Sequence, residues 1–416
     1  RQRQMCIRDR MKTVDVIRPG SLRTIIGPSG TLKRIIQNKD YFEHRGYLIN
    51  VYTHDNINGS LYKPMDNSMN QSYIKNGIKK IKAYLRLKAK SMKLLAFIYL
   101  YRDYLNVKRL VNYYISLNKT PDILVFHSTT ECYLYHKMKT NENSKVVLFF
   151  HSDGIPNKML YSYYPCIKNS IIAKWLMRIH NEAFLSADKC VFIAKNGQDN
   201  FLKIYPDYPT KKTALILNGI EDFSVSEVEE LKKVEQKYES FKYRLCSTGT
   251  INQRKGQRII IEALAATKKD KREQIHLALI GEGPERVRLE KLVNDYGLAK
   301  NVTFEGLIEN SQVYKYLYQN NIYILMSNNE GLPISIIEAM RTGLPVISTK
   351  ISGIPELVDI NGILIDPNVE QLTTIFDHMD EYDWNVMGKR SRERWKKDFT
   401  FDRMKKQYCD MLDSLF

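Results

Sequence analysis

The sequence predicts an α/β protein whose strands form parallel sheets. Short, continuous apolar runs such as Val146–Phe150 and Ile322–Met326 are typical of strands that are covered on both faces, and Ile275–Ile280, which is apolar except for His276, reads as a further strand. Helical patterns lie between such runs, and a strand followed by a helix and another strand indicates a parallel connection. The 416 residues suffice for two domains, or for one large domain, with buried cores.

The most informative stretch covers residues 321–358. It begins with the last of those apolar runs, which a polar loop follows. We expect Pro333 at the first position of a short helix, where its missing N–H costs nothing. Gly343 ends this helix, and Val346–Thr349 forms the next strand. The stretch therefore reads as strand, loop, helix, turn and strand.

Two carboxylates stand out in this stretch. Glu330 lies in the loop at the carboxyl end of the first strand, and Glu338 lies inside the helix, about 8 Å further along its axis than Pro333. Ligands of open α/β sheets bind at the carboxyl ends of strands, and helix N-termini attract phosphate. A ligand with a sugar, a central diphosphate and a ribose would fit this layout. An ordinary αβ unit with two solvated glutamates is the alternative.

The motif around these carboxylates resembles a known family. Glu330 and Glu338 are framed by E-G-L-P, E-A-M and G-x-P-V-I, and S-G-I-P-E-L-V follows. This pattern is similar to the signature of the GT4 family of retaining glycosyltransferases. The resemblance implies the GT-B fold, in which two Rossmann-like, doubly wound domains face each other across a cleft and a C-terminal helix crosses back to the first domain.

The resemblance also implies a division of the chain. We expect a Rossmann-like acceptor-side domain over residues 11–218 and a linker or surface insertion over 219–241. A nucleotide-sugar-binding domain over 242–394 and a helix over 395–416, packed on the first domain, would follow. Residues 1–10 have no periodicity and no apolar segment, so we expect a non-native leader before Met11.

Several glycine-containing turns match the family's donor-binding loops. In the first half, Gly27 and Gly30 lie at a strand-to-helix turn that resembles the family's glycine-rich loop, although a plain turn explains them as well. In the second half, the resemblance assigns donor contacts to Gly281 and Gly283 and to the backbone of Gly331 and Leu332. These four residues follow two of the expected strands.

The diphosphate site is where this sequence departs from the family's pattern. Gly249 follows an expected strand, and the family has an arginine next and a lysine before a second glycine. Lys255 matches the lysine, but Thr250 occupies the arginine position. Arg254, which precedes Lys255, is a candidate replacement. The resemblance therefore implies Lys255 as a cation that neutralises the donor diphosphate, with Arg254 as the candidate second cation.

A histidine follows one strand of the first half. His151 comes directly after Val146–Phe150, in the sequence H-S-D-G. A lone histidine at such a place is often structural. The family has a histidine in the cleft that contacts the donor sugar, so the resemblance implies this function for His151.

The net charge of +18 is concentrated in the first half. Residues 11–217 hold 32 Lys and Arg against 14 Asp and Glu, whereas residues 218–416 hold 28 against 31. The excess is strongest in Lys75–Leu110, where apolar residues at partly helical spacings interleave with 11 basic residues and one acid. An anionic membrane surface is the partner we expect, and a solvated helix pair packed on the sheet is the alternative. Nothing resembles a nucleic-acid reader, so we expect no nucleic-acid partner.

The remaining composition favours a cytoplasmic protein. The six cysteines contain no C-x-x-C pair and indicate neither a zinc site nor a disulfide framework. The apolar run Leu94–Tyr101 is too short to span a bilayer. We therefore expect a cytoplasmic protein that lies peripherally at the inner face of the membrane.

Taken with the resemblance, these features predict a retaining, metal-independent glycosyltransferase. His151, Lys255 and Glu330 are the expected catalytic residues, Glu338 the expected ribose ligand, and a nucleotide-diphosphate-sugar the co-substrate in place of a cofactor. The acceptor would be a glycan or a lipid-linked glycan of a surface or capsular polysaccharide. A nucleotide-sugar epimerase of the same fold and a non-catalytic, basic protein that binds membrane surfaces are the alternatives.

Overall fold

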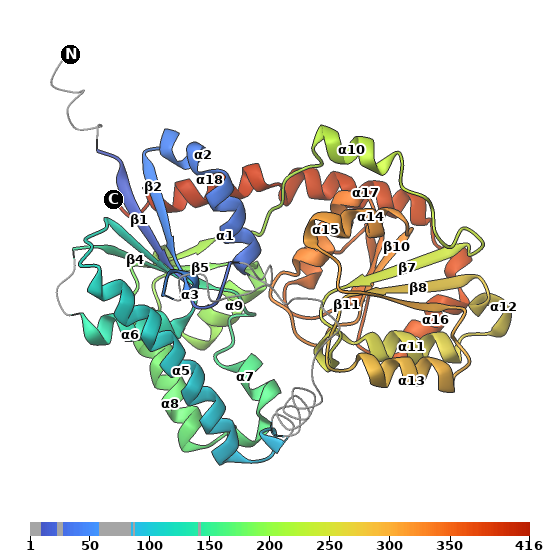
Figure 1. Cartoon of the computed structure of the whole chain (residues 1–416), viewed down its shortest axis with the longest axis horizontal. Helices are drawn as coiled ribbons and strands as arrows, with labels where there is room; N and C mark the ends of the chain where they lie inside the picture. The colour runs from blue at the N-terminus through green and yellow to red at the C-terminus, as the bar shows by residue number, and fades with distance from the viewer. Residues whose placement is uncertain (1–9, 23–27, 58–84, 86–87, 140–142) are drawn as a thin grey trace, which may run out of the picture. The chain divides into compact units, whose positions relative to one another are not determined.

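The computed structural model describes residues 10–22, 28–57, 85, 88–139 and 143–416, which form two compact units. The first unit extends to Phe192 and also contains Gln198–Leu215 and Cys409–Phe416. The second unit contains Ile193–Gly197 and Ile216–Tyr408. Each unit is built on one six-stranded sheet (Figure 1).

The sheet of the first unit is parallel, with strand order β2-β1-β3-β4-β5-β6. The chain first adds β2 on one side of β1 and then β3 on the other side. The topological switch point therefore lies between β1 and β3, and ligands of such sheets bind at the carboxyl ends of those two strands. The strands are β1 Lys12–Ile17, β2 Tyr47–Tyr52, β3 Ile123–Phe126, β4 Lys145–Phe150, β5 Lys189–Phe192 and β6 Thr213–Leu215.

The sheet of the second unit is also parallel, with strand order β12-β11-β10-β7-β8-β9. The chain adds β8 and β9 on one side of β7, and it then returns to add β10 on the other side of β7. Its switch point therefore lies between β7 and β10. The strands are β7 Tyr243–Thr248, β8 Ile275–Ile280, β9 Val302–Gly306, β10 Ile322–Leu325, β11 Val346–Thr349 and β12 Gly362–Ile365.

Helices flank both sheets, as the alternating pattern predicts. The described helices that begin before residue 210 are α1 Pro28–Gln37, α2 Lys39–His44, α3 His54–Ile57, α5 Lys93–Ser116, α6 Thr129–Met138, α7 Lys158–Tyr163, α8 Ile171–Leu185 and α9 Lys195–Ile204. The later ones are α10 Val225–Leu231, α11 Gln257–Ala266, α12 Lys269–Arg272, α13 Arg286–Asp295, α14 Val313–Tyr318, α15 Ile334–Thr342, α16 Val369–Asp377, α17 Trp384–Asp398 and α18 Phe401–Asp413. The doubly wound α/β fold class is thereby confirmed.

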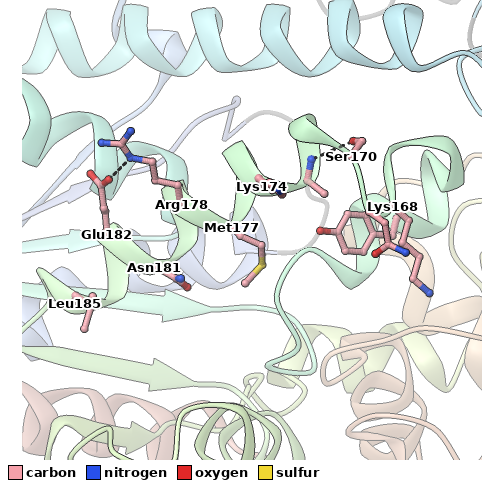
Figure 2. A pocket seen from close by; sticks show the side chains of 11 residues that line it. Lys168, Ser170, Lys174, Met177, Arg178, Asn181, Glu182 and Leu185 are labelled. Carbon is pink, nitrogen blue, oxygen red and sulfur yellow. Dashed lines mark hydrogen bonds and ion pairs between the residues drawn. The ribbon is translucent and has the colours of Figure 1, made fainter.

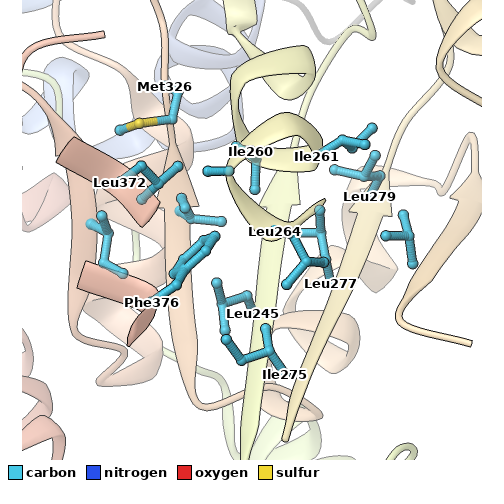
Figure 3. Packing of buried hydrophobic residues seen from close by; sticks show 14 of the residues in the cluster. Leu245, Ile260, Ile261, Leu264, Ile275, Leu277, Leu279, Met326, Leu372 and Phe376 are labelled. Carbon is cyan, nitrogen blue, oxygen red and sulfur yellow. The ribbon is translucent and has the colours of Figure 1, made fainter. Parts of the chain in front are cut away.

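The continuous apolar runs arise because both faces of the second sheet are buried. Alternate residues of a strand point to opposite faces. Leu245 and Ile324 belong to one core cluster, whereas their neighbours Cys246 and Leu325 belong to the other. Figure 3 shows the first cluster, in which α11 and α16 contribute Ile260, Ile261, Leu264, Leu372 and Phe376. A strand covered on both faces needs apolar residues on both, and β10 Ile322–Leu325 has them at every position.

Some element boundaries differ from those expected. The sequence shows a helical pattern from Thr31 to Arg45 after the turn at Gly27 and Gly30, but the structure has two helices there, which separate at Asn38, and the first begins earlier, at Pro28. Pro333 is the residue before α15 and not its first helical residue. Residue 395, where we expected a separate last helix to start, lies within α17.

The interruption between α17 and α18 has a tertiary cause. Ile220 donates its N–H to the Phe399 carbonyl at 3.1 Å, and Phe401 donates its N–H to the Ile220 carbonyl at 2.9 Å. These bonds form a short parallel bridge with Thr400, which takes the backbone out of the helical hydrogen-bonding pattern. The stretch Asp398–Phe401 contains neither Gly nor Pro, so the sequence has no strong helix breaker at this point.

The basic segment is described only in part. Residues 75–84 and 86–87 lie outside the described residues, and α5 accounts for most of the remainder. The expectation of a helix is confirmed for α5. Among the described residues, no helix combines the length and apolar character that crossing a membrane requires.

We predict that Leu277→Ala destabilises the second unit by about 2–5 kcal/mol. Leu277 is 1% exposed in the first core cluster, and truncation removes buried methyl groups and leaves a cavity. Urea unfolding would measure the loss. Val287→Ala, at an exposed position of α13, is the control and should change the free energy of unfolding by less than about 0.5 kcal/mol. Equal effects of the two substitutions would contradict the burial of Leu277.

Candidate functional site

Two loops meet at the switch point of the second sheet. One follows β7, which ends at Thr248, and the other follows β10, which ends at Leu325. Gly256, with φ of 69°, packs so closely that a Cβ atom on it would lie 1.9 Å from the Met326 carbonyl oxygen. Asn328 donates its N–H to the Arg254 carbonyl at 2.9 Å. The turn that carries Arg254 and Lys255 is therefore fixed against the loop after β10.

This contact assembles three charged side chains. One carboxylate oxygen of Glu330, Oε1, lies 2.8 Å from Nη1 of Arg254 and 2.8 Å from Nζ of Lys255. The same oxygen accepts a hydrogen bond from Oγ of Ser327 at 2.9 Å. Arg254 also donates to the Asn329 carbonyl at 2.8 Å. The structure thus brings together Lys255, Arg254 and Glu330, all of which the sequence had singled out.

The charges of this cluster determine the ionisation of Glu330. The Glu330 and Lys255 side chains are only 9% and 11% exposed. Burial raises the pKa of the Glu330 carboxyl, but the positive charges of Lys255 and Arg254 outweigh burial, so the pKa lies below its ordinary value of 4.5. Glu330 is therefore ionised at neutral pH. Two cations and one carboxylate leave one net positive charge at this edge of the sheet.

The N-terminus of α15 follows directly. Within the described part of the chain, the N–H groups of Gly331 and Leu332 donate no hydrogen bond. Their carbonyl groups are held: Gly331 accepts from the Gly353 N–H at 3.0 Å, and Leu332 accepts from the side-chain amide of Asn218 at 3.1 Å. Free N–H groups at a helix N-terminus form a site for an anion. Glu338 is half-buried in the second turn of this helix.

The glycine turns after β7 and β8 pack against each other. A Cβ atom on Gly281 would lie 2.0 Å from the Gly249 carbonyl oxygen, and one on Gly283 would lie 2.1 Å from the Ile251 carbonyl oxygen. Gly249 donates its N–H to Ile280 at 2.9 Å, and Gly281 donates its N–H to Gly306 at 2.8 Å. These two N–H groups are therefore used within the protein, and both glycines shape the loops.

Thr250 lies next to these turns and is exposed. Its carbonyl group accepts a hydrogen bond from the side-chain amide of Gln257 at 3.2 Å. No basic side chain comes from this position, and the guanidinium that reaches Glu330 comes from Arg254.

A histidine pair lies at the carboxyl ends of β3 and β4, next to the switch point of the first sheet. His151 follows β4, as expected, and His127 follows the neighbouring strand β3. Nδ1 of His127 lies 2.8 Å from Nε2 of His151, and the ring centroids are 5.0 Å apart at an interplanar angle of 16°. Glu131 accepts the backbone N–H of His127 at 3.0 Å and the hydroxyl of Ser128.

Burial keeps this cluster close to neutral. Burial and the positive charge of Arg18 lower the pKa of His151 to about 3. Burial also lowers the pKa of His127 well below its ordinary value, and it raises the pKa of the Glu131 carboxyl to about 7. Both imidazoles are therefore uncharged at neutral pH. Such a histidine can donate one hydrogen bond and accept another, but it does not add charge.

The two glycines expected near the first sheet have different outcomes. Gly27 lies outside the described residues. Gly30 is buried in the first turn of α1, so it belongs to the helix and not to the preceding loop.

None of the expected site residues lines the groove of about 750 Å³ that follows α8, where Arg178 pairs with Glu182 and Ser170 caps the helix (Figure 2).

A comparison with known families identifies the second half of the chain. The model of the family described as glycosyl transferases group 1 matches residues 195–396. This segment belongs to the glycosyl transferases group 1 family. The group 1 segment contains Lys255, Glu330 and Glu338, and it includes both loops of the switch point.

Curated relatives support this assignment. The chain is 27% identical over 238 residues to an uncharacterized glycosyltransferase, MJ1069, of Methanocaldococcus jannaschii. The aligned segment covers 56% of this chain and 60% of that protein. It is 32% identical over 124 residues to the amylovoran biosynthesis glycosyltransferase AmsK of Erwinia amylovora, or 28% of this chain and 30% of that protein. The chain therefore spans 60% or less of the length of these two relatives.

Solved structures match the chain over nearly its whole length. Alr3699/HepE of Anabaena aligns with a TM-score of 0.63 and 17% identity, covering 97% of this chain and all of that one. The sucrose-phosphate synthase of Thermosynechococcus elongatus aligns with a TM-score of 0.70 and 18% identity, covering 97% and 99%. WaaG, a lipopolysaccharide glycosyltransferase, aligns with a TM-score of 0.65 and 16% identity, covering 96% and 99%. At these identities the likeness shows the fold, which is GT-B.

The sequence missed several residues that hold the group 1 site. Asn218 and Ser327 position the loop around Glu330, and His127 and Glu131 adjoin His151. His127 carried a usable signal, because it directly follows a strand that neighbours β4. Asn218 carried none, because its partner Leu332 is more than a hundred residues away.

We predict that Glu330→Gln destabilises the second unit by about 1–3 kcal/mol at neutral pH, because the buried Lys255 and the half-buried Arg254 lose their counter-charge. Since the folded-state pKa of Glu330 lies below 4.5, ionised Glu330 contributes stability above that value, and this stability is lost as the pH falls through the folded-state pKa. The difference between parent and variant should therefore shrink in acid. Urea unfolding at several pH values would measure it, and a difference independent of pH would contradict the ion cluster.

We also predict that His151 stays neutral down to about pH 4, because its pKa lies at about 3. An unfolded chain protonates this histidine near its ordinary value of 6.5, so the buried imidazole lowers the stability of the folded state as the pH falls below that value. The imidazole chemical shifts in an NMR titration would test this. A titration midpoint near 6.5 would contradict the buried, neutral state.

Proposed function

We propose that the chain is a retaining glycosyltransferase that moves a sugar from a nucleotide-diphosphate-sugar to an acceptor hydroxyl. The observation that carries the proposal is the cluster of Lys255, Arg254 and Glu330 beside the N-terminus of α15, at the switch point of the sheet. Alr3699/HepE of Anabaena has been crystallised with UDP and with UDP-glucose, which supports a donor of this class.

The cations and the helix end would stabilise the leaving group. When the bond between the sugar C1 and the phosphate oxygen breaks, negative charge grows on the diphosphate. Lys255 and Arg254 supply one net positive charge after Glu330 is counted, and the N–H groups of Gly331 and Leu332 lie just before the N-terminus of α15, which carries about half a positive charge. Donors preorganised at the place where charge develops usually contribute most to catalysis.

Arg254 is proposed to replace the arginine that is missing at Thr250. Its guanidinium is fixed by two contacts at 2.8 Å, to the Asn329 carbonyl and to Oε1 of Glu330, and its side chain is 24% exposed. It therefore lies beside Lys255 and remains accessible from solvent. With both cations in place, the diphosphate would need no divalent metal, and we expect activity to persist in a chelator.

Glu330 and Glu338 are proposed to bind the two ends of the donor. Oε1 of Glu330 already receives three donors, and no described residue donates to its other oxygen, Oε2. Oε2 can therefore accept a hydroxyl of the donor sugar while Oε1 keeps the side chain in place. Glu338, one turn into α15, is proposed to accept the ribose hydroxyls.

The proposed reaction is a front-face attack with retention. The bond between C1 and the acceptor oxygen forms as the bond to phosphate breaks, and the acceptor proton goes to the leaving phosphate oxygen. In the first unit, the carboxylate next to the histidine pair is Glu131, which is fully buried and accepts hydrogen bonds from His127 and Ser128. It is therefore a poor nucleophile, and His151 is proposed to contact the donor sugar. Detection of a covalent glycosyl adduct by mass spectrometry would overturn this mechanism.

The acceptor is proposed to be a glycan or a lipid-linked glycan of a surface or capsular polysaccharide, at the inner face of the membrane. AmsK is described as an amylovoran biosynthesis glycosyltransferase and WaaG as a glycosyltransferase of lipopolysaccharide biosynthesis, which supports an acceptor of this class. The excess of Lys and Arg over residues 11–217 favours an acceptor held on an anionic surface.

A panel of nucleotide-sugars tests the proposal. We expect one donor to raise the melting temperature and to be hydrolysed slowly without an acceptor, with the released sugar keeping its anomeric configuration when it is observed immediately by NMR. Epimerised donor would instead identify an epimerase. The absence of any donor-dependent thermal shift would contradict the proposal and support the alternative of a non-catalytic binding protein.

We predict that Lys255→Met lowers kcat for donor hydrolysis by about 10²–10³, because one preorganised donor to the leaving diphosphate is lost. Arg254→Met should lower kcat in the same direction if Arg254 replaces the missing arginine. Lys291→Met, at an exposed position of α13, is the matched control and should leave kcat unchanged. Full activity of Lys255→Met would contradict the proposed diphosphate site.

A further inference from the structure

Helix α5 presents large apolar side chains on two opposite faces. Its inner face packs into the first unit through residues that are at most 8% exposed: Ala96, Leu100, Leu110, Val111 and Tyr114. On its outer face, Leu94, Ile98, Tyr101 and Leu105 are 71%, 53%, 44% and 41% exposed. We call these four residues the outer stripe. A surface helix of a soluble domain normally places polar residues there.

The outer stripe is continuous. Its members are spaced four, three and four residues apart, and at 100° per residue they fall within about 60° of the helix circumference. Phe97, which is exposed and stacks on Tyr101 at 5.5 Å between ring centroids, widens the stripe on one side. Isolated exposed apolar residues need no explanation, but a row of this length indicates a surface that is covered by something else.

Basic side chains surround the outer stripe. Lys93 and Arg102 are exposed along it, and Lys108 and Arg109 lie on either side of its continuation toward the C-terminus of α5. Asp103 is the helix's one acid, and it pairs with Arg102 at 3.3 Å. A second copy of this helix would bring like charges together along the row, whereas an anionic surface would complement them.

We propose that the outer stripe of α5 docks the protein on an anionic lipid bilayer. The apolar side chains enter the boundary between headgroups and acyl chains, the tyrosine lies at the headgroup level, and the lysines and arginines contact lipid phosphates. The inner face stays packed in the first unit, so the helix lies along the membrane surface. The proposal extends the membrane-held acceptor of the proposed function by naming the surface that makes the contact.

Sedimentation with lipid vesicles tests this docking surface. We expect the full chain to bind vesicles of phosphatidylglycerol and phosphatidylcholine and to bind phosphatidylcholine alone much more weakly. Lys108→Gln with Arg109→Gln should weaken binding about fivefold for each cation removed. Leu94→Ser with Ile98→Ser should weaken it about tenfold, while Val225→Ser with Val287→Ser, at exposed positions of α10 and α13, should leave it unchanged.

Two results would overturn the proposal. One is equal binding of parent and stripe variants to anionic vesicles. The other is a dimer, seen by light scattering, that the stripe variant dissociates while vesicle binding is absent, because the stripe would then join two copies of the chain. The donor-dependent thermal shift is measured on the same variants, so failure of membrane docking is distinguished from failure of the proposed enzymatic function.

A separate observation concerns the histidine pair. The contact of 2.8 Å between Nδ1 of His127 and Nε2 of His151 holds one proton between two neutral rings. Phe149 stacks on His127 at 4.9 Å and 14°, and Glu131 fixes the backbone of His127. The His127 ring is therefore held by its neighbours and can orient His151.

The surroundings of His127 decide which ring donates. Its other nitrogen, Nε2, is buried and has no hydrogen-bond partner within the described residues. If His151 donated the shared proton, neutral His127 would carry its own proton on Nε2, as a buried donor without an acceptor. If His127 donates, Nε2 carries only a lone pair, which is less costly than an orphaned N–H and is favoured near the positive charge of Arg18.

We infer that His127 is a positioning residue that holds His151 as the Nδ1–H tautomer. Nε2 of His151 then accepts from His127, and Nδ1–H is the group that His151 offers as a hydrogen-bond donor. This inference rests on the proposed function only in assigning the donated hydrogen bond to the sugar. The tautomer itself is a property of the protein without substrate.

Nitrogen NMR of the ¹⁵N-labelled full chain tests the tautomer directly. We expect the parent to show His151 protonated on Nδ1. His127→Phe keeps a ring that stacks on Phe149 but removes the shared proton, so Nε2–H should become the main form of His151 and kcat should fall more than KM changes. His180→Phe, at another buried histidine of the first unit, is the control.

An Nε2–H tautomer in the parent, or an unchanged tautomer in His127→Phe, would overturn the inference. An Nδ1–H tautomer that shifts as expected, together with no detectable sugar transfer, would instead retain the inference and reject the proposed function.

Discussion

The candidate site depends on one backbone contact between two loops. Gly256 lies against the Met326 carbonyl with no space for a side chain, and the hydrogen bond from Asn328 to Arg254 closes the contact. This contact places the Arg254–Lys255 turn on the loop that carries Glu330. Without it, Arg254 and Lys255 would not both contact the same oxygen atom of Glu330, which lies seventy-five residues beyond Lys255 in the sequence.

Both units place their polar side chains at the same topological position. In each sheet the chain reverses its direction of strand addition once, between β1 and β3 or between β7 and β10. Loops diverge there, which leaves room for side chains at the carboxyl ends of the strands. Arg18 and His127 follow the first pair of strands, and the Lys255 turn and Glu330 follow the second. The two clusters differ in charge: the histidines are neutral, whereas the lysine cluster keeps one net positive charge.

Much of the fold and part of the site could be predicted from the sequence. The strands of the second sheet were visible because burial on both faces requires apolar residues at successive positions, and Glu330 and Glu338 were visible because a family motif frames them. His151 was found from its position directly after β4. The partners of these residues were not visible: Asn218 bonds to Leu332 across the sequence, and Oγ of Ser327 resembles any other loop hydroxyl until the loop is folded. The break between α17 and α18 was hidden for the same reason, because Ile220 causes it from a distant segment.

The sequence by itself determined the alternation of strands and helices, the concentration of positive charge in the first half, and which side chains are candidates for the site. These properties are local: they follow from periodicity, composition and short motifs. The tertiary structure decided that Arg254 lies beside Lys255 on Glu330, that the Gly249 and Gly281 N–H groups are used within the protein, and that His127 contacts His151. Each of these depends on distances between residues far apart in the chain, which only the pairing of strands and the packing of their loops establish.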